Sequence, residues 1–179
     1  MYIFGIVPVM TLLAPYKLIT GNYIEPNYLV FIYASLASIF IVKILVLIYK
    51  RWFKNLPFKI LLLSMIMFLM GSVLLWLCVR PCFYEIVIVA GFYFVLQGIF
   101  CVFKAIEKDK INYIYLTIAC ISMALAVGCR PTCLLASILI IPVLYKILKN
   151  NIHEKKDILK FILCVRSTVF RYWNFFDDI

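Results

Sequence analysis

The sequence GCRPT, residues 128–132, separates two apolar runs of the chain, residues 111–127 and 133–148. Each run approaches the roughly 20 residues that a helix needs to cross the hydrocarbon core of a bilayer. An arginine at the centre of a span costs roughly 3 kcal/mol, and proline disfavours a continuous helix but suits the first turn of a new one. The stretch therefore predicts a tight hairpin in which Arg130 emerges at the membrane surface between two helices.

The composition of the whole chain agrees with a membrane location. Of its 179 residues, 66% are hydrophobic and 15% are charged, and the mean hydropathy is +1.08. Ordinary soluble domains are roughly 45–50% apolar. Because residues 1–13 carry no charge, a cleavable signal peptide is not expected either. Helices satisfy their own backbone hydrogen bonds in lipid, so we expect an all-α, polytopic transmembrane bundle of about six spans with short loops.

The expected spans follow from the apolar runs and the polar stretches between them. They are residues 1–16, which are short and contain two prolines, and residues 28–49, 58–79, 82–103, 111–127 and 131–148. Residues 1–163 then form one transmembrane helical domain, which we interpret as a fragment of a larger membrane protein. Residues 164–179 form an atypical C-terminal tail with no continuous apolar run.

The net charge of +10 would suggest nucleic-acid binding in a soluble protein, but here the basic residues cluster in short loops beside apolar runs. Residues 50–59, 104–110 and 146–160 hold four, three and five Lys or Arg, whereas the opposite loops hold one each. Basic loops favour the cytoplasmic side. We therefore expect these three loops to be cytoplasmic, membrane lipids to be the surroundings, and no nucleic acid to bind.

The seven cysteines do not predict a metal site, because their number is odd and no four-ligand zinc spacing is present. They are Cys78, Cys82, Cys101, Cys120, Cys129, Cys133 and Cys164. We interpret them as buried thiols that pack as small apolar groups, with a disulfide across the outer face as the alternative. No metal and no other cofactor is expected.

Two predicted outer turns have the same composition. Arg80-Pro81 and Arg130-Pro131 lie fifty positions apart, and each joins two expected spans. Each arginine has two interpretations. It is a helix-end residue that meets lipid headgroups, or it binds phosphate, since guanidinium pairs with phosphate oxygens in a bidentate manner. In the second case the helix start after each proline adds N–H donors, and the pair would hold a lipid-linked phosphate or diphosphate.

Two neighbouring residues complete the candidate site. Glu85 lies five positions after Arg80, in the first turn of an expected helix. It stabilises the positive end of that helix, or it contacts a substrate hydroxyl or pairs with Arg130. Tyr84 is an interfacial aromatic residue or a surface on which a sugar stacks. The set of candidate binding residues is therefore Arg80, Tyr84, Glu85 and Arg130, and no catalytic residue is assigned.

Positions inside the expected spans suggest packing roles. Lys43, near the end of its span, is expected to extend its ammonium group toward the interface. Gln97 is expected to hydrogen-bond to another helix, and Gly71, Gly91 and Gly98 are expected to allow close helix approach.

Three stretches in order carry a resemblance to a known family. They are residues 2–8 (YIFGIVP) with 14–16 (APY) and 18–21 (LITG), then Arg80-Pro81 with Tyr84-Glu85, and finally residues 124–131 (ALAVGCRP). Residues 1–163 resemble the middle portion of a family of large bacterial polytopic membrane proteins that are described as glycosyltransferases of the GT-C type.

The resemblance implies a bacterial cytoplasmic (plasma) membrane protein of the cell envelope. GT-C enzymes transfer a sugar from a polyprenyl-phosphate donor at the outer face, and Arg80 and Arg130 would bind the donor phosphate. Their catalytic acids usually lie in a first large outer loop, which has no counterpart here, so we expect the chain to be inactive alone. The alternatives are a piece of a lipid-linked sugar transporter or flippase and a non-catalytic membrane fragment.

Overall fold

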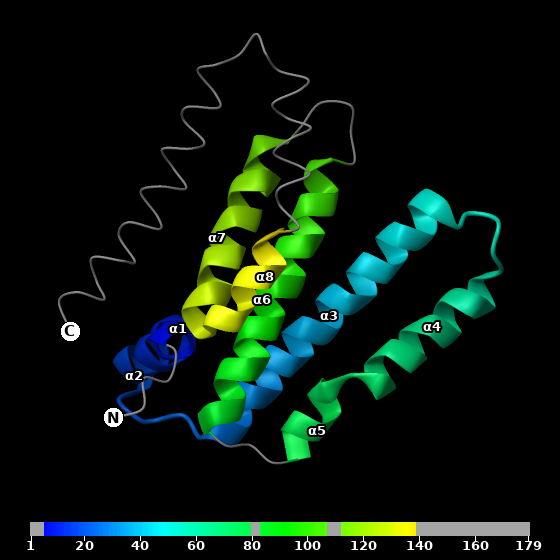
Figure 1. Ribbon diagram of the computed structural model, residues 1–179. Coiled ribbons are helices and arrows are strands. Elements are labelled where there is room, and N and C mark those ends of the chain that lie inside the picture. The colour runs from blue at the N-terminus through cyan, green and yellow to red at the C-terminus, as the bar shows by residue number, and fades with distance from the viewer. Residues whose placement is uncertain (1–5, 80–82, 107–111, 139–179) are drawn as a thin grey trace, which may run out of the picture.

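The computed structural model describes residues 6–79, 83–106 and 112–138, and every regular element in these ranges is a helix (Figure 1). The elements are α1 (Ile6–Pro8), the π-helical turn η1 (Val9–Leu13), α2 (Ala14–Thr20), α3 (Pro26–Trp52), α4 (Phe58–Gly71), α5 (Val73–Val79), α6 (Phe83–Ala105), α7 (Tyr113–Cys129), the 3-10 turn η2 (Pro131–Cys133) and α8 (Leu134–Ser137). The predicted all-helical class is therefore confirmed for the described residues.

Among the described residues, fewer candidate membrane spans are found than the sequence predicts. In the described ranges, α3 and the Tyr84–Ala105 stretch of α6 are long and apolar enough to cross a membrane, and α4 with α5 adds a third if the bent pair is one span. The helix α7 covers only 17 residues. The described residues therefore do not support about six spans, because α7 and the N-terminal helices are shorter than the other candidates. Residues 139–148 of the expected last span lie outside the described ranges.

The expected span 58–79 is broken where α4 meets α5. The two helices differ in direction by 41°, and Ser72 between them has an extended backbone. Its Oγ donates a hydrogen bond to the Leu69 carbonyl at 2.9 Å. Glycine has low helix propensity, and serine competes for backbone carbonyls, so Gly71-Ser72 ends the first helix. A Cβ on Gly71 would meet nothing within 4 Å, so the expectation that Gly71 packs against a helix is wrong.

The core of the described bundle is built on the contact between α6 and α7, which lie side by side (Figure 1). A Cβ on Gly98 would lie 2.8 Å from Met123 Cε, and one on Gly91 would lie 3.4 Å from Cys129 Cβ. The prediction that these two glycines allow close helix approach is confirmed. Small residues let backbones come close enough to pack without a hydrophobic driving force between helices.

Aromatic rings join α3 to the other side of α6. The ring pairs, with their centroid distances, are Tyr33–Tyr93 (5.9 Å), Tyr33–Phe94 (6.3 Å), Phe40–Tyr93 (5.8 Å), Phe40–Phe100 (5.6 Å) and Trp52–Phe103 (6.1 Å). Because the residue numbers rise together on both helices, α3 and α6 run in the same direction. The helix α6 therefore lies at the centre of the bundle, with α7 against one face and α3 against another.

This arrangement gives the bundle two chemically different ends. One end, called the basic end below, is formed by the last turns of α3 and α6 and carries Lys50, Arg51 and Lys104. The opposite end, called the Arg130 end, is formed by the starts of α3 and α6 and the end of α7 (Figure 1).

The N-terminal helices pack at the Arg130 end of the bundle. The helix α1 contacts α6 and α7, and Val7 within it is buried. A hydrogen bond of 2.5 Å joins Thr11 Oγ1 to Tyr33 Oη of α3. Gly21 then ends α2 with a positive φ of 70°, which glycine adopts without steric cost. Residues 6–16 of the expected span 1–16 are helical, and this helical run continues to Thr20, where Gly21 ends it. Residues 1–5 lie outside the described ranges, so whether this segment spans fully stays open.

Candidate functional site

Arg130 leaves the end of α7 much as the sequence predicts. The helix ends at Cys129, and Arg130 has an extended backbone (φ −147°, ψ 129°). Its N–H still donates to the Ala126 carbonyl at 3.0 Å, which anchors the residue to the last turn of the helix. Pro131 then begins the 3-10 turn. The predicted break between two helices at GCRPT is therefore confirmed, within one residue of the expected boundary.

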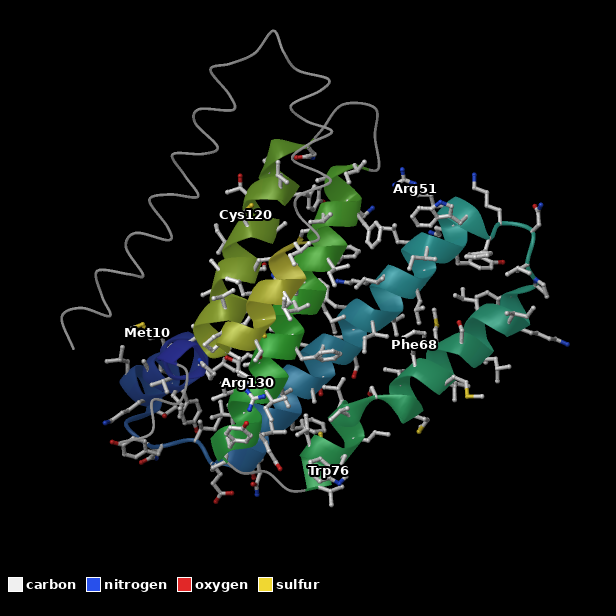
Figure 2. The ribbon with its side chains drawn as sticks, in the orientation of Figure 1. Met10, Arg51, Phe68, Trp76, Cys120 and Arg130 are labelled. Atoms are coloured by element: carbon white, nitrogen blue, oxygen red, sulfur yellow. The ribbon has the colours of Figure 1, made fainter. Side chains whose placement is uncertain are left out.

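The Arg130 side chain lies over the ring of Tyr84, in the first turn of α6. The guanidinium carbon is 4.4 Å from the ring centroid, and Arg130 is half-buried in this position (Figure 2). A cation–π contact contributes about 0.5–2 kcal/mol. An arginine carries five N–H donors in the plane of its guanidinium, which is the geometry that pairs with an anion.

Glu85 follows Tyr84 and is buried, with 9% of its surface exposed. It lies in the first turn of α6, where a carboxylate is stabilised by the positive end of the helix dipole. This position fits the first interpretation of Glu85, as a residue that stabilises its own helix. It also puts a negative charge one residue away from the ring that holds Arg130.

The turn after Arg130 contributes fewer N–H donors than expected. Pro131 has no N–H, the N–H of Cys133 donates to the Arg130 carbonyl at 3.0 Å, and the N–H of Leu134 is bonded inside the turn. An anion at this end would therefore be bound mainly by the guanidinium and not by a helix start. The fourth candidate residue, Arg80, lies outside the described ranges, so the paired arginines stay a prediction.

The cysteines near this site are thiols in the described residues. Cys129 is buried and Cys133 is partly buried, and both are free. Among the residues that the structure describes, no group of three or more His, Cys, Asp or Glu could hold a metal ion. The alternative of a disulfide across the outer face stays a prediction, because Cys82 lies outside the described ranges.

A seven-residue spacing in the sequence indicates the contact between Tyr84 and Arg130, which the two Arg-Pro turns do not indicate. Tyr84, Gly91 and Gly98 are spaced by seven residues, and residues seven apart lie two turns apart on one helix face. The two glycines face α7, so the same face of α6 presents Tyr84 to the end of α7. This heptad spacing, more than the Arg-Pro turns, indicates that Tyr84 and Arg130 are neighbours.

Comparisons with known proteins find no match to this chain. The chain matches no protein-family model, no curated protein and no solved structure. The resemblance to GT-C-type proteins therefore stays a prediction that rests on the motifs quoted above.

Proposed function

We propose that the Arg130 end binds the phosphate of a lipid-linked substrate, and that the chain is the substrate-binding fragment of a GT-C-like glycosyltransferase that uses a polyprenyl-phosphate-linked sugar. The observation that carries the proposal is the cation–π contact of Arg130 with Tyr84, with the guanidinium carbon 4.4 Å from the ring centroid. The contact joins the end of α7 to the start of α6, so the guanidinium is fixed before an anion arrives. A fixed side chain loses less conformational entropy on binding.

Each residue has a separate role in this proposal. The in-plane N–H groups of Arg130 donate to two phosphate oxygens, which is the strong, bidentate mode for guanidinium. Tyr84 holds the guanidinium plane by its ring, and its exposed edge is available to the sugar. Glu85 keeps the local charge balanced and orients the start of α6. Arg80 would supply a second guanidinium for a diphosphate.

Binding of a polyprenyl phosphate to the purified full-length chain in detergent tests this proposal. Arg130→Ala should weaken binding by at least about tenfold, equivalent to 1.4 kcal/mol, whereas Arg130→Lys should keep part of it because the charge remains. Lys17→Ala is the matched control, since Lys17 also lies over a tyrosine ring, that of Tyr23, at 4.4 Å. Unchanged binding by a folded Arg130→Ala variant would overturn the proposal.

We also infer that the protein lies in the bacterial cytoplasmic membrane with its basic end inside the cell. The distribution of basic residues supports this orientation. Lys50, Arg51 and Lys104 are at the basic end, and the loops 50–59, 104–110 and 146–160 hold most of the cations. Positive loops are retained in the cytoplasm. The Arg130 end then faces outward, where a lipid-linked sugar donor would be used.

Single cysteines in a cysteine-free background test this orientation. Thr132 and Asn55 are both exposed and belong to opposite ends of the bundle. In spheroplasts, a membrane-impermeant maleimide should label Thr132→Cys from outside, and Asn55→Cys should label only after lysis. Labelling of Asn55→Cys from outside would reverse the orientation. Native Cys129 is unsuitable for labelling, because only 4% of its surface is exposed.

A lipid-linked sugar transporter is the second candidate function. The observation that favours it is the 41° bend between α4 and α5, because transporters use broken helices at their substrate sites. Reconstituted protein that moves a labelled polyprenyl-phosphate sugar across liposomes would support this function, and movement no faster than in empty liposomes would exclude it.

A further inference from the structure

The ammonium group of Lys43 lies in the seam between α3 and α6. Its Nζ is 5.1 Å from the ring centroid of Phe40, one turn earlier on α3, and 5.9 Å from that of Phe100 on α6. The sequence predicts that Lys43 extends toward the interface. In the structure its Nζ lies beside these two rings, and the position of the interface stays a prediction. The side chain is exposed at the surface of the bundle.

The charge of Lys43 is not neutralised by an acid of the described chain. The acidic residues in the described ranges are Glu25 and Glu85, which stand at the starts of α3 and α6, at the opposite end of the bundle. A cation in a membrane span is costly, and cation–π contacts return about 0.5–2 kcal/mol of that cost. An anion supplied by the surroundings would stabilise the ammonium group further.

A second cation borders the same seam closer to the basic end. The guanidinium carbon of Arg51 is 5.2 Å from the ring of Trp52, and Trp52 meets Phe103 of α6 edge-on at 6.1 Å. Phe103 stands one turn beyond Phe100. Each of the two cations, Lys43 and Arg51, therefore lies against aromatic rings of the seam, and Figure 2 shows Arg51 near the end of α3.

Lys43 and Arg51 reach one headgroup when both side chains turn toward it. Lys43 and Arg51 are eight residues apart on one helix, which separates them by about 12 Å along its axis. Both side chains are long, and their apolar stems can lie on the aromatic rings while the charged groups turn toward a common anion. Basic pockets between helices near the membrane surface bind acidic lipid headgroups.

We propose that this seam binds an acidic phospholipid, with its phosphate between Lys43 and Arg51 and its acyl chains against the aromatic rings of α3 and α6. A lipid with net negative charge fits, because a zwitterionic headgroup brings its own cation into competition with the two side chains. The site lies at the end opposite Arg130 and does not depend on the function proposed for that end.

Native mass spectrometry of the purified full-length chain tests the site, with phosphatidylglycerol and phosphatidylcholine of the same acyl chains as probes. The unmodified protein should retain phosphatidylglycerol in preference to phosphatidylcholine. Lys43→Gln and Arg51→Gln should each reduce that retention by about fivefold, as expected for one basic side chain at an anionic surface.

Two matched variants keep the test specific. Lys54→Gln removes the same charge from an exposed position after α3 and should change retention less than twofold. Lys43→Arg keeps the charge and should retain the lipid, even if Lys43→Gln fails to fold. Equal losses for Lys43→Gln, Arg51→Gln and Lys54→Gln would indicate general attraction to a basic surface and would overturn the site, as would unchanged retention in the first two variants.

Discussion

The contact between α6 and α7 and the pair formed by α4 and α5, called the α4–α5 arm, are both apolar but pack differently. The α6–α7 contact is lined by small residues, among them Gly91, Gly98 and Ala126, and Ala126 is fully buried. The arm instead carries large apolar side chains that remain exposed: Leu63, Met67, Phe68, Met70, Val73 and Trp76. Apolar character alone therefore does not decide which helices of this chain come together.

Lipid in place of water as the surrounding solvent would explain why the two regions pack differently. In water, exposed residues of the arm would drive it onto the bundle, but lipid tails are as apolar as leucine and remove that driving force. Helix contact in a membrane then depends on how closely two backbones approach. The glycines of α6 allow close approach, whereas the large side chains of the arm prevent it and are stable against lipid.

The largest effect should come from filling the α6–α7 contact. Gly98→Leu should lower the free energy of unfolding by about 3 kcal/mol, because a Cβ there already lies 2.8 Å from Met123 Cε. Met123 can yield to one methyl group but not to a whole leucine side chain. Unfolding of the full-length chain in mixed detergent micelles measures the change.

The same substitution in the arm is the control. A Cβ on Gly71 would meet nothing within 4 Å, so Gly71→Leu should change the unfolding free energy by no more than about 0.5 kcal/mol. Similar losses for the two variants would mean that the difference between the bundle and the arm has no energetic counterpart.

Replacing a large side chain by alanine should lower the free energy of unfolding in the bundle but not in the arm, and this effect should be smaller. Phe94 is 6% exposed and contacts Tyr33, whereas Phe68 in the arm is 59% exposed. In a membrane, Phe94→Ala loses packing contacts but little hydrophobic transfer energy, so it should cost about 2 kcal/mol, less than in a soluble core. Phe68→Ala should have no measurable effect on unfolding. A loss from Phe68→Ala as large as that from Phe94→Ala would show that another surface covers the arm.

The sequence predicts the local features of this fold well. The helical class follows from apolar content, the break at GCRPT follows from proline and arginine, and the packing at Gly91 and Gly98 follows from residue size. Each of these depends on one helix and its immediate chemistry. The same local reasoning names Tyr84, Glu85 and Arg130 as neighbours of helix ends, where the structure has them.

The sequence does not predict which helices meet or how many cross the membrane. The neighbours α3 and α6 are separated along the chain by the whole arm, and the aromatic residues that join them are spaced like those of any apolar helix. The bend at Ser72 lies inside the continuous apolar run 60–79, where one Gly-Ser pair is a weak signal against strong helix formers. The Lys43 ammonium group lies near Phe40 of its own helix and near Phe100 of another helix, and the second contact has no signal in the sequence.

The smallest effect should come from the link between the N-terminal helices and α3. The hydroxyl of Thr11 donates to the Val7 carbonyl at 2.8 Å, so its single proton is already used. Tyr33 must therefore donate in the 2.5 Å contact between Tyr33 Oη and Thr11 Oγ1. This assignment makes the two partners unequal, since only Tyr33 loses its acceptor when the other residue is changed.

Thr11→Val should therefore cost more than Tyr33→Phe. Removing Thr11 leaves a buried tyrosine hydroxyl without an acceptor, at about 1 kcal/mol or more, whereas Tyr33→Phe leaves Thr11 bonded to Val7 and should cost about 0.6 kcal/mol, the average for such bonds between membrane helices. Tyr28→Phe on the same helix is the control, because Tyr28 is exposed. Unfolding free energies of the single and double variants measure the coupling, and equal costs for Thr11→Val and Tyr33→Phe would reverse the assigned direction of the bond.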